Sequence, residues 1–246
     1  MQQASITAPC MAGYCGNYRN SMAVTNTEFN EKDEKTEIEA KFVCPEGLDL
    51  ETLLGRIHIL GFHSYKEKPC FQTDVYFDTP QYAHLHSGTA LRIRKRSETH
   101  VGAYKVSEKQ QGAIFERREF EWRLSDDEIK VWNEEKRAVI PPTILHKLHL
   151  QGQTLRKVLA VETHRYAAIL SSTDGFEAEL SLDEVAFRGH KGQKYFREIE
   201  IELLHGLYGQ LKQVTDGLQN QFKLQPAIDS KYRQGMMLVG KYGIAS

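Results

Sequence analysis

Several segments of the sequence alternate charged and apolar residues with a period of two. Glu37, Glu39 and Lys41, for example, alternate with apolar residues at positions 38, 40 and 42. Side chains two apart lie on the same face of a β-strand, so this pattern predicts a strand with one charged and one apolar face. Strand-like segments occur at 36–43, 72–78, 89–97, 101–107, 114–123, 160–170, 176–184 and 194–204.

A smaller number of segments have the features of helices. Two apolar stripes, at 50–60 and 207–222, have the spacing of amphipathic helices. Because helices do not alternate regularly with the predicted strands, the order of elements argues against a parallel α/β sheet. We therefore expect a mainly β fold of the α+β type, built from antiparallel strands.

Capping residues predict where two further helices begin. Ser125 and Glu128 match a capping box, and the two prolines at 141–142 are expected to end the helix that follows. A short C-terminal helix is expected to begin near Asp229 or Ser230, either of which is a good N-cap residue.

Charged residues share one face on nearly every predicted strand, and these faces carry both signs. A single such strand is most simply explained by a solvent-exposed outer face. Taken together, the faces are better explained by an eight-stranded closed barrel whose charged faces line a tunnel and whose exterior is covered by helices. The residues on these faces are Glu37, Glu39, Lys41, Arg92, Arg94, Arg96, Lys105, Arg117, Glu119, Glu121, Arg165, Glu177, Glu179, Ser181, Asp183, Glu198, Glu200 and Glu202.

Composition excludes several classes of partner. The 246 residues are 40% hydrophobic, and the formal net charge of −1 argues against a general nucleic-acid or membrane surface. No apolar run approaches the roughly 20 residues of a membrane span, and the N-terminus lacks the pattern of a secretory signal. The four cysteines show no zinc or CxxC spacing, which favours reduced thiols in a cytoplasmic protein. Residues 1–33 lack periodicity and are expected to form a disordered tail before a domain at 34–246.

The charged tunnel predicts a chemistry. Closely spaced carboxylates repel one another unless a cation joins them, and hard oxygen ligands suit Mg²⁺ or Mn²⁺. Inward-facing arginines and lysines suit phosphate oxygens. Since the sequence has no glycine-rich phosphate loop, side chains would have to bind the phosphates. The combination predicts a metal-dependent site for a small-molecule polyphosphate.

The motifs that carry these charges resemble those of the CYTH superfamily, also called triphosphate tunnel metalloenzymes. Glu37-Ile-Glu39-Ala-Lys41 matches the ExExK signature of that family. The other motifs follow in the order of the family and cover about residues 34–240. They are Asp74-Val-Tyr-Phe-Asp78-Thr-Pro80, Leu91-Arg92-Ile-Arg94, Lys105, Arg117-Arg-Glu119-Phe-Glu121, Glu198-Ile-Glu200-Ile-Glu202 and Ser230-Lys231.

The resemblance implies an eight-stranded antiparallel tunnel that acts on triphosphates with Mg²⁺ or Mn²⁺. It implies metal ligands at Glu37, Glu39, Glu200 and Glu202, with Glu198 and Asp183 as weaker candidates. Glu37, Glu39 and Lys41 are the expected catalytic residues. The expected phosphate-binding residues are Lys41, Arg92, Arg94, Lys105, Arg117, Arg165 and Lys231. The sequence departs from the family at Ala167, where relatives often have a second basic residue.

The resemblance leaves several activities open. The segment from Ser230 to Gly235 is similar to the bacterial inorganic triphosphatase branch, which implies hydrolysis of inorganic triphosphate to pyrophosphate and phosphate. The alternatives are a class IV adenylate cyclase, a thiamine triphosphatase and a polyphosphate-binding module without turnover. A homodimer is compatible with the resemblance. We expect Asp74, Tyr76 and Asp78 to be structural, and Tyr232 and Arg233 to lie on the helix surface or in packing.

Overall fold

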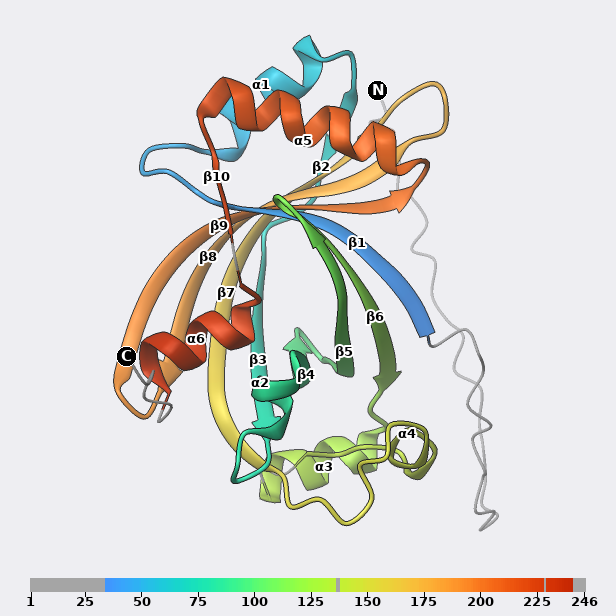
Figure 1. Ribbon diagram of the computed structural model, residues 1–246, viewed down its shortest axis with the longest axis vertical. Coiled ribbons are helices and arrows are strands. Elements are labelled where there is room, and N and C mark those ends of the chain that lie inside the picture. Colours follow the sequence, from blue (N-terminus) through green and yellow to red (C-terminus); the bar gives the residue numbers. More distant parts are fainter. Residues whose placement is uncertain (1–33, 136–137, 228, 241–246) are drawn as a thin grey trace, which may run out of the picture.

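Eight long strands form a closed antiparallel barrel in the computed structural model, which describes residues 34–135, 138–227 and 229–240 (Figure 1). Neighbouring strands follow the order β1-β6-β5-β4-β3-β7-β8-β9, and β9 pairs with β1 to close the barrel. The predicted fold class is therefore confirmed, whereas the expected tail at 1–33 lies outside the described residues. The barrel strands are β1 (Glu34–Val43), β3 (Cys70–Asp78), β4 (Thr89–Arg96), β5 (Thr99–Gln111), β6 (Ile114–Arg123), β7 (Arg156–Ser171), β8 (Glu177–Gly189) and β9 (Gly192–His205).

Two short strands add to the barrel and were not predicted. β2 (His63–Lys66) pairs with β7, and β10 (Gln225–Pro226) pairs with β1. Neither is long enough to show a sustained alternation of polar and apolar residues, which explains why the sequence pattern did not reveal them.

The strand register brings opposite charges together inside the barrel. Residues directly opposite each other in an antiparallel pair point to the same side of the sheet. Glu37 lies opposite Arg117, Lys105 opposite Glu119, and Arg165 opposite Asp183. All of these carboxylates and Arg117 are buried, so the charged faces point inward as the sequence pattern predicts.

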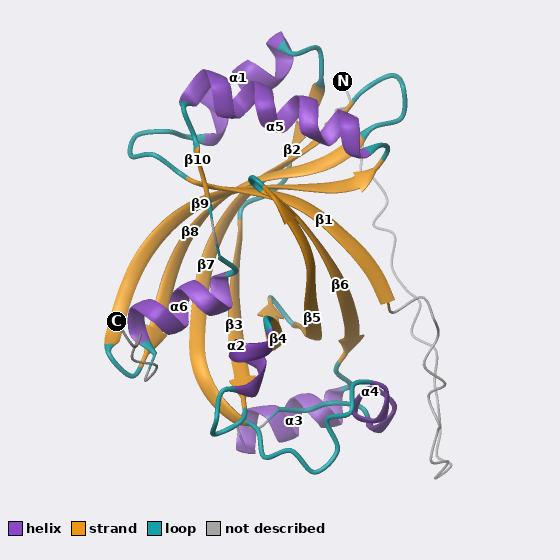
Figure 2. Cartoon of the chain, in the orientation of Figure 1, coloured by secondary structure: helices purple, strands orange, loops and turns teal. Residues whose placement is uncertain are grey.

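Helices α1 (Leu50–Ile59) and α5 (Tyr208–Phe222) cover the outer face of the barrel at one end (Figure 2). Their apolar stripes pack against the outward residues of β1, β8 and β9, as the two predicted stripes require. Asp49 caps α1 by accepting a hydrogen bond from the backbone N–H of Thr52 at 2.8 Å. The buried residues of this cluster include Phe42, Leu53, Leu180, Ile199, Leu211 and Leu218.

Helices α3 (Asp126–Glu135) and α4 (Pro142–Lys147) lie at the other end. The capping box is confirmed, because Glu128 accepts a hydrogen bond from the Ser125 backbone N–H at 2.8 Å and Ser125 Oγ accepts from Glu128 N. The predicted end of this helix at the prolines is wrong. α3 already ends at Glu135, and Pro142 instead opens α4, where the missing N–H of a first helical residue costs nothing.

Helix α6 (Lys231–Val239) packs against the inner faces of β7 and β8, beside strands β7–β9 in Figure 1. Ser230 is its N-cap and accepts a hydrogen bond from the Arg233 N–H at 3.2 Å, which confirms the predicted start. A further short helix, α2 (Ala83–Ser87), follows β3 and was not predicted. None of the described helices is long and apolar enough to cross a membrane.

Candidate functional site

The inward side chains surround a cavity of about 130 Å³ within the barrel. Predicted site residues that line it are Glu37, Glu39, Lys41, Arg92, Arg94, Lys105, Arg117, Arg165, Glu200, Glu202 and Lys231. The lining also includes side chains to which the sequence analysis assigned no role at this site, namely Lys35, Tyr76, Ser107, Glu119, Glu121, Ser230 and Tyr232. Carboxylates and cations from seven barrel strands and from α6 thus meet in one space.

The β1 glutamates are paired with cations from β5 and β6. Lys105 Nζ donates to both carboxylate oxygens of Glu37 at 2.7 Å. Glu39 accepts from Arg117 and lies 3.0 Å from Lys41 Nζ. Burial opposes the ionised form of Glu37, but the charge of Lys105 outweighs it and lowers the pKa of this carboxyl.

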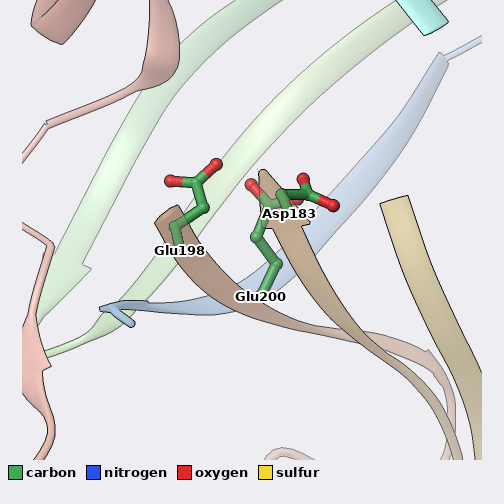
Figure 3. A group of neighbouring side chains, drawn as sticks. All are labelled: Asp183, Glu198 and Glu200. Carbon is green, nitrogen blue, oxygen red and sulfur yellow. The ribbon is translucent and has the colours of Figure 1, made fainter. Parts of the chain in front are cut away.

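A second group of carboxylates surrounds Lys231. Oxygens of Asp183, Glu198 and Glu200 lie within 4.8 Å of one another, and Figure 3 shows the three side chains together on β8 and β9. Lys231 Nζ lies 2.9 Å from both Asp183 and Glu200 and also pairs with Glu198. Despite its burial, these three negative charges raise the pKa of Lys231 well above its usual value. An ammonium group therefore already neutralises this acidic group.

Glu202 lies in a different environment. It is directly opposite Glu39 in the β1–β9 pair, and its ion pair with Lys35 spans 3.9 Å. Burial, followed by the negative charges of Glu37 and Glu39, raises the pKa of Glu202 to about 7. Glu37, Glu39 and Glu202 thus form a set of oxygen donors with too little positive charge around Glu202. That donor chemistry fits a hard divalent cation such as Mg²⁺ or Mn²⁺.

The β4 arginines are held by an aspartate on β3. Asp74 accepts two hydrogen bonds from Arg94, at 2.7 Å from Nε and 2.9 Å from Nη2. Arg92 Nη1 lies 3.6 Å from the same carboxylate and Arg92 Nη2 lies 3.4 Å from Glu119. Although burial opposes ionisation, Arg94 and Arg92 lower the pKa of Asp74. Asp74 therefore fixes two guanidinium groups that line the cavity.

Arg165 makes the densest set of contacts on the β7 wall. It donates to both oxygens of Asp183 at 2.8 and 2.7 Å, to Glu179 at 2.8 Å, and to Glu200. Ala167 is buried opposite Ser181, so this part of the wall carries no second basic group. The departure from the family pattern noted in the sequence therefore falls on the wall of the barrel.

The structure places the weaker candidates away from the cavity and brings in residues that sequence reasoning missed. Asp183 and Glu198 are buried against Lys231 and are absent from the cavity lining given above. Glu119 contacts Lys105 at 3.2 Å and Lys35 at 3.3 Å. Burial would raise the pKa of Glu119, but Lys105, Arg92 and Lys35 lower it to about 2. Its period-two spacing from Arg117 was the available signal.

Tyr232 departs from the expectation of a helix-surface or simple packing residue. Its side chain is 2% exposed and lies against the cavity, whereas that of Arg233 is 56% exposed. The sequence gave no signal for this difference, because it depends on how α6 enters the barrel.

Comparison with known proteins agrees with the fold. A family model described as the CYTH domain matches residues 35–233, which span all eight barrel strands and the start of α6. No curated protein matches the sequence.

Two solved structures share the fold. A proposed adenylate cyclase from Bacillus halodurans is 20% identical with a TM-score of 0.56, over 83% of this chain and 99% of that one. A proposed adenylyl cyclase from Hippeastrum, reported to have a dominant triphosphatase activity, is 18% identical with a TM-score of 0.57, over 82% and 96% of the two chains. Because the family model spans well over half of the sequence, the chain belongs to the CYTH domain family.

Proposed function

We propose that this protein hydrolyses a triphosphate in a metal-dependent reaction, with inorganic triphosphate as the substrate and pyrophosphate and phosphate as products. The observation that carries the proposal is the convergence of acidic and basic side chains on one cavity inside a closed barrel. Most lining residues are charged, which suits a ligand that is itself almost entirely charged. The reported triphosphatase activity of the Hippeastrum relative supports the same reaction class.

Glu37, Glu39 and Glu202, with Glu200 beside them, would hold Mg²⁺ or Mn²⁺ in this proposal. The metal, when bound, would neutralise negative charge that develops on the phosphates. Asp183 and Glu198 are weaker candidates than the sequence suggested, because Lys231 already lies between them.

The phosphates would be bound by the cations that face the cavity, which are Lys41, Arg92, Arg94, Lys105, Arg117, Arg165 and Lys231. Guanidinium groups match phosphate oxygens in pairs, and ammonium groups add point charges. Glu37, Glu39 and Lys41 form the proposed catalytic set, in which one carboxylate orients the attacking water. The barrel wall limits bulk water and strengthens each of these electrostatic contacts.

A panel of substrates tests the proposal. The purified protein is incubated with inorganic triphosphate, ATP or thiamine triphosphate, with and without Mg²⁺ or Mn²⁺, and phosphate, pyrophosphate and cyclic AMP are measured. We expect metal-dependent release of phosphate and pyrophosphate from inorganic triphosphate. Cyclic AMP as the main product would instead identify an adenylate cyclase, a preference for thiamine triphosphate would identify that activity, and tight binding without turnover would identify a binding module.

The variant Glu39→Gln tests the site within the same assay. It removes one negative charge from the cavity while preserving the shape of the side chain, so metal-dependent turnover should be abolished. The matched control is Glu184→Gln, which changes a strand glutamate whose side chain is 49% exposed. The control should keep full activity. Full activity of Glu39→Gln, with a normal melting temperature, would contradict the assignment of the barrel interior as the site.

A further inference from the structure

Helix α6 begins with two neighbouring residues that reach different parts of the barrel. Lys231 extends into the acidic group of Asp183, Glu198 and Glu200. Tyr232 instead donates a hydrogen bond from its hydroxyl to Asp78 Oδ2 at 2.6 Å. Its ring also stacks on Tyr76, with centroids 5.1 Å apart and planes 12° from parallel. The first turn of α6 is therefore attached to the barrel at two points.

Asp78 is a rigid partner for this hydroxyl. Its carboxylate is fully buried and accepts backbone hydrogen bonds from Thr79 at 2.7 Å, His84 at 2.9 Å and Leu85 at 3.0 Å. These three donors fix the carboxylate against the turn between β3 and α2. A hydrogen bond to a buried and ionised acceptor is also stronger than one between neutral groups. We call Asp78 and Tyr232 together the α6 latch.

The other inner contacts of α6 lack direction. Met236 and Val239 are buried among apolar residues of β7 and β8, such as Leu159 and Phe187. Apolar contacts are not directional, so they tolerate small rotations and shifts of a helix of nine residues. The latch supplies the directional contact next to Lys231, and it therefore controls where the ammonium group lies.

We propose that Tyr232 is a positioning residue, which acts through the α6 latch to hold Lys231 in the barrel for contact with the substrate. This inference rests on the proposed function, in which Lys231 binds substrate phosphates. Tyr232 also touches the cavity, so its action through Lys231 must be separated from a direct contact with the substrate.

Lysine acetylation followed by mass spectrometry tests the latch without any substrate. Tyr232→Phe is the variant of choice because it keeps the stacked ring, whereas Asp78→Asn would set an amide against three backbone donors and endanger folding. Lys231 is 6% exposed and should react slowly in the wild type, relative to Lys212, which is half exposed. We expect its reaction rate to rise roughly tenfold in Tyr232→Phe, since the lost bond to a charged group corresponds to about that factor.

Tyr195→Phe is the matched control, because it removes the hydroxyl of a tyrosine that is 78% exposed. It should leave the rate at Lys231 unchanged. An unchanged rate in Tyr232→Phe as well would overturn the latch, whether or not the protein hydrolyses triphosphate.

A double-mutant cycle on turnover tests the link to the substrate. We expect Tyr232→Phe to lower kcat/KM for inorganic triphosphate about tenfold in the wild type and to have no further effect in Lys231→Gln. Fully additive losses would overturn the inference, because Tyr232 would then act independently of Lys231. Faster acetylation in a protein without any triphosphate turnover would keep the latch, but it would reject both the proposed function and the role toward substrate.

Discussion

Individual charged residues in the barrel are stabilised by their partners. Burial of an isolated charge is costly, but the inward cations each form an ion pair with at least one carboxylate, as Arg94 does with Asp74 and Lys105 with Glu37. The pairs also fix the side chains, so that their remaining N–H groups point in defined directions. Stability and readiness to bind an anion thus depend on the same contacts.

Loss of Asp74 should reveal this dependence. Asp74→Ala leaves Arg92 and Arg94 without the carboxylate between them, and breaking a buried pair from one side costs about 3–5 kcal/mol. Urea unfolding should therefore show a much lower free energy of unfolding. The control is Asp216→Ala, which breaks an exposed pair with Lys212 on α5 and should leave the unfolding curve unchanged. Equal curves for the two variants would show that Asp74 contributes little to stability.

At the scale of elements, the sequence predicted what repeats over many residues. The long strands were recognised because their inner faces carry charges at every second position, and α1 and α5 because their apolar stripes cover the barrel. Short elements such as α2, α4 and β2 depend on contacts with distant segments. The end of α3 was misplaced because a proline is compatible with both the end of one helix and the start of the next.

The close approach of α6 to the barrel yields a prediction for glycines in helices. A Cβ atom at Gly235 would lie 2.6 Å from Leu159 Cδ2 and 2.7 Å from Phe187 Cδ1, both in the buried core. Gly235→Ala should destabilise the protein by about 1–3 kcal/mol because it overpacks this contact. Gly55→Ala in α1 meets nothing within 4 Å and should instead stabilise by up to about 1 kcal/mol. Denaturant unfolding measures both, and a stabilising Gly235→Ala would contradict the packing of α6.

At the scale of the whole molecule, closure of the barrel creates the site. β1 pairs with β6 on one side and β9 on the other, so Glu37 and Glu39 meet residues that are about 80 and 160 positions away in the sequence, such as Arg117 and Glu202. The sequence predicted which side chains face inward. It could not predict which carboxylates receive Lys231, because that depends on the register at the closing seam and on the depth at which α6 enters.

The most direct measurement of the central claim is the position of Mn²⁺ in crystals grown with a non-hydrolysable analogue of inorganic triphosphate. Anomalous scattering locates the metal independently of any assay. The account predicts a peak inside the barrel, between Glu37, Glu39 and Glu202, with the analogue bound to the arginines and lysines of the cavity. A peak on the outer surface, or one that replaces Lys231 among Asp183, Glu198 and Glu200, would contradict it.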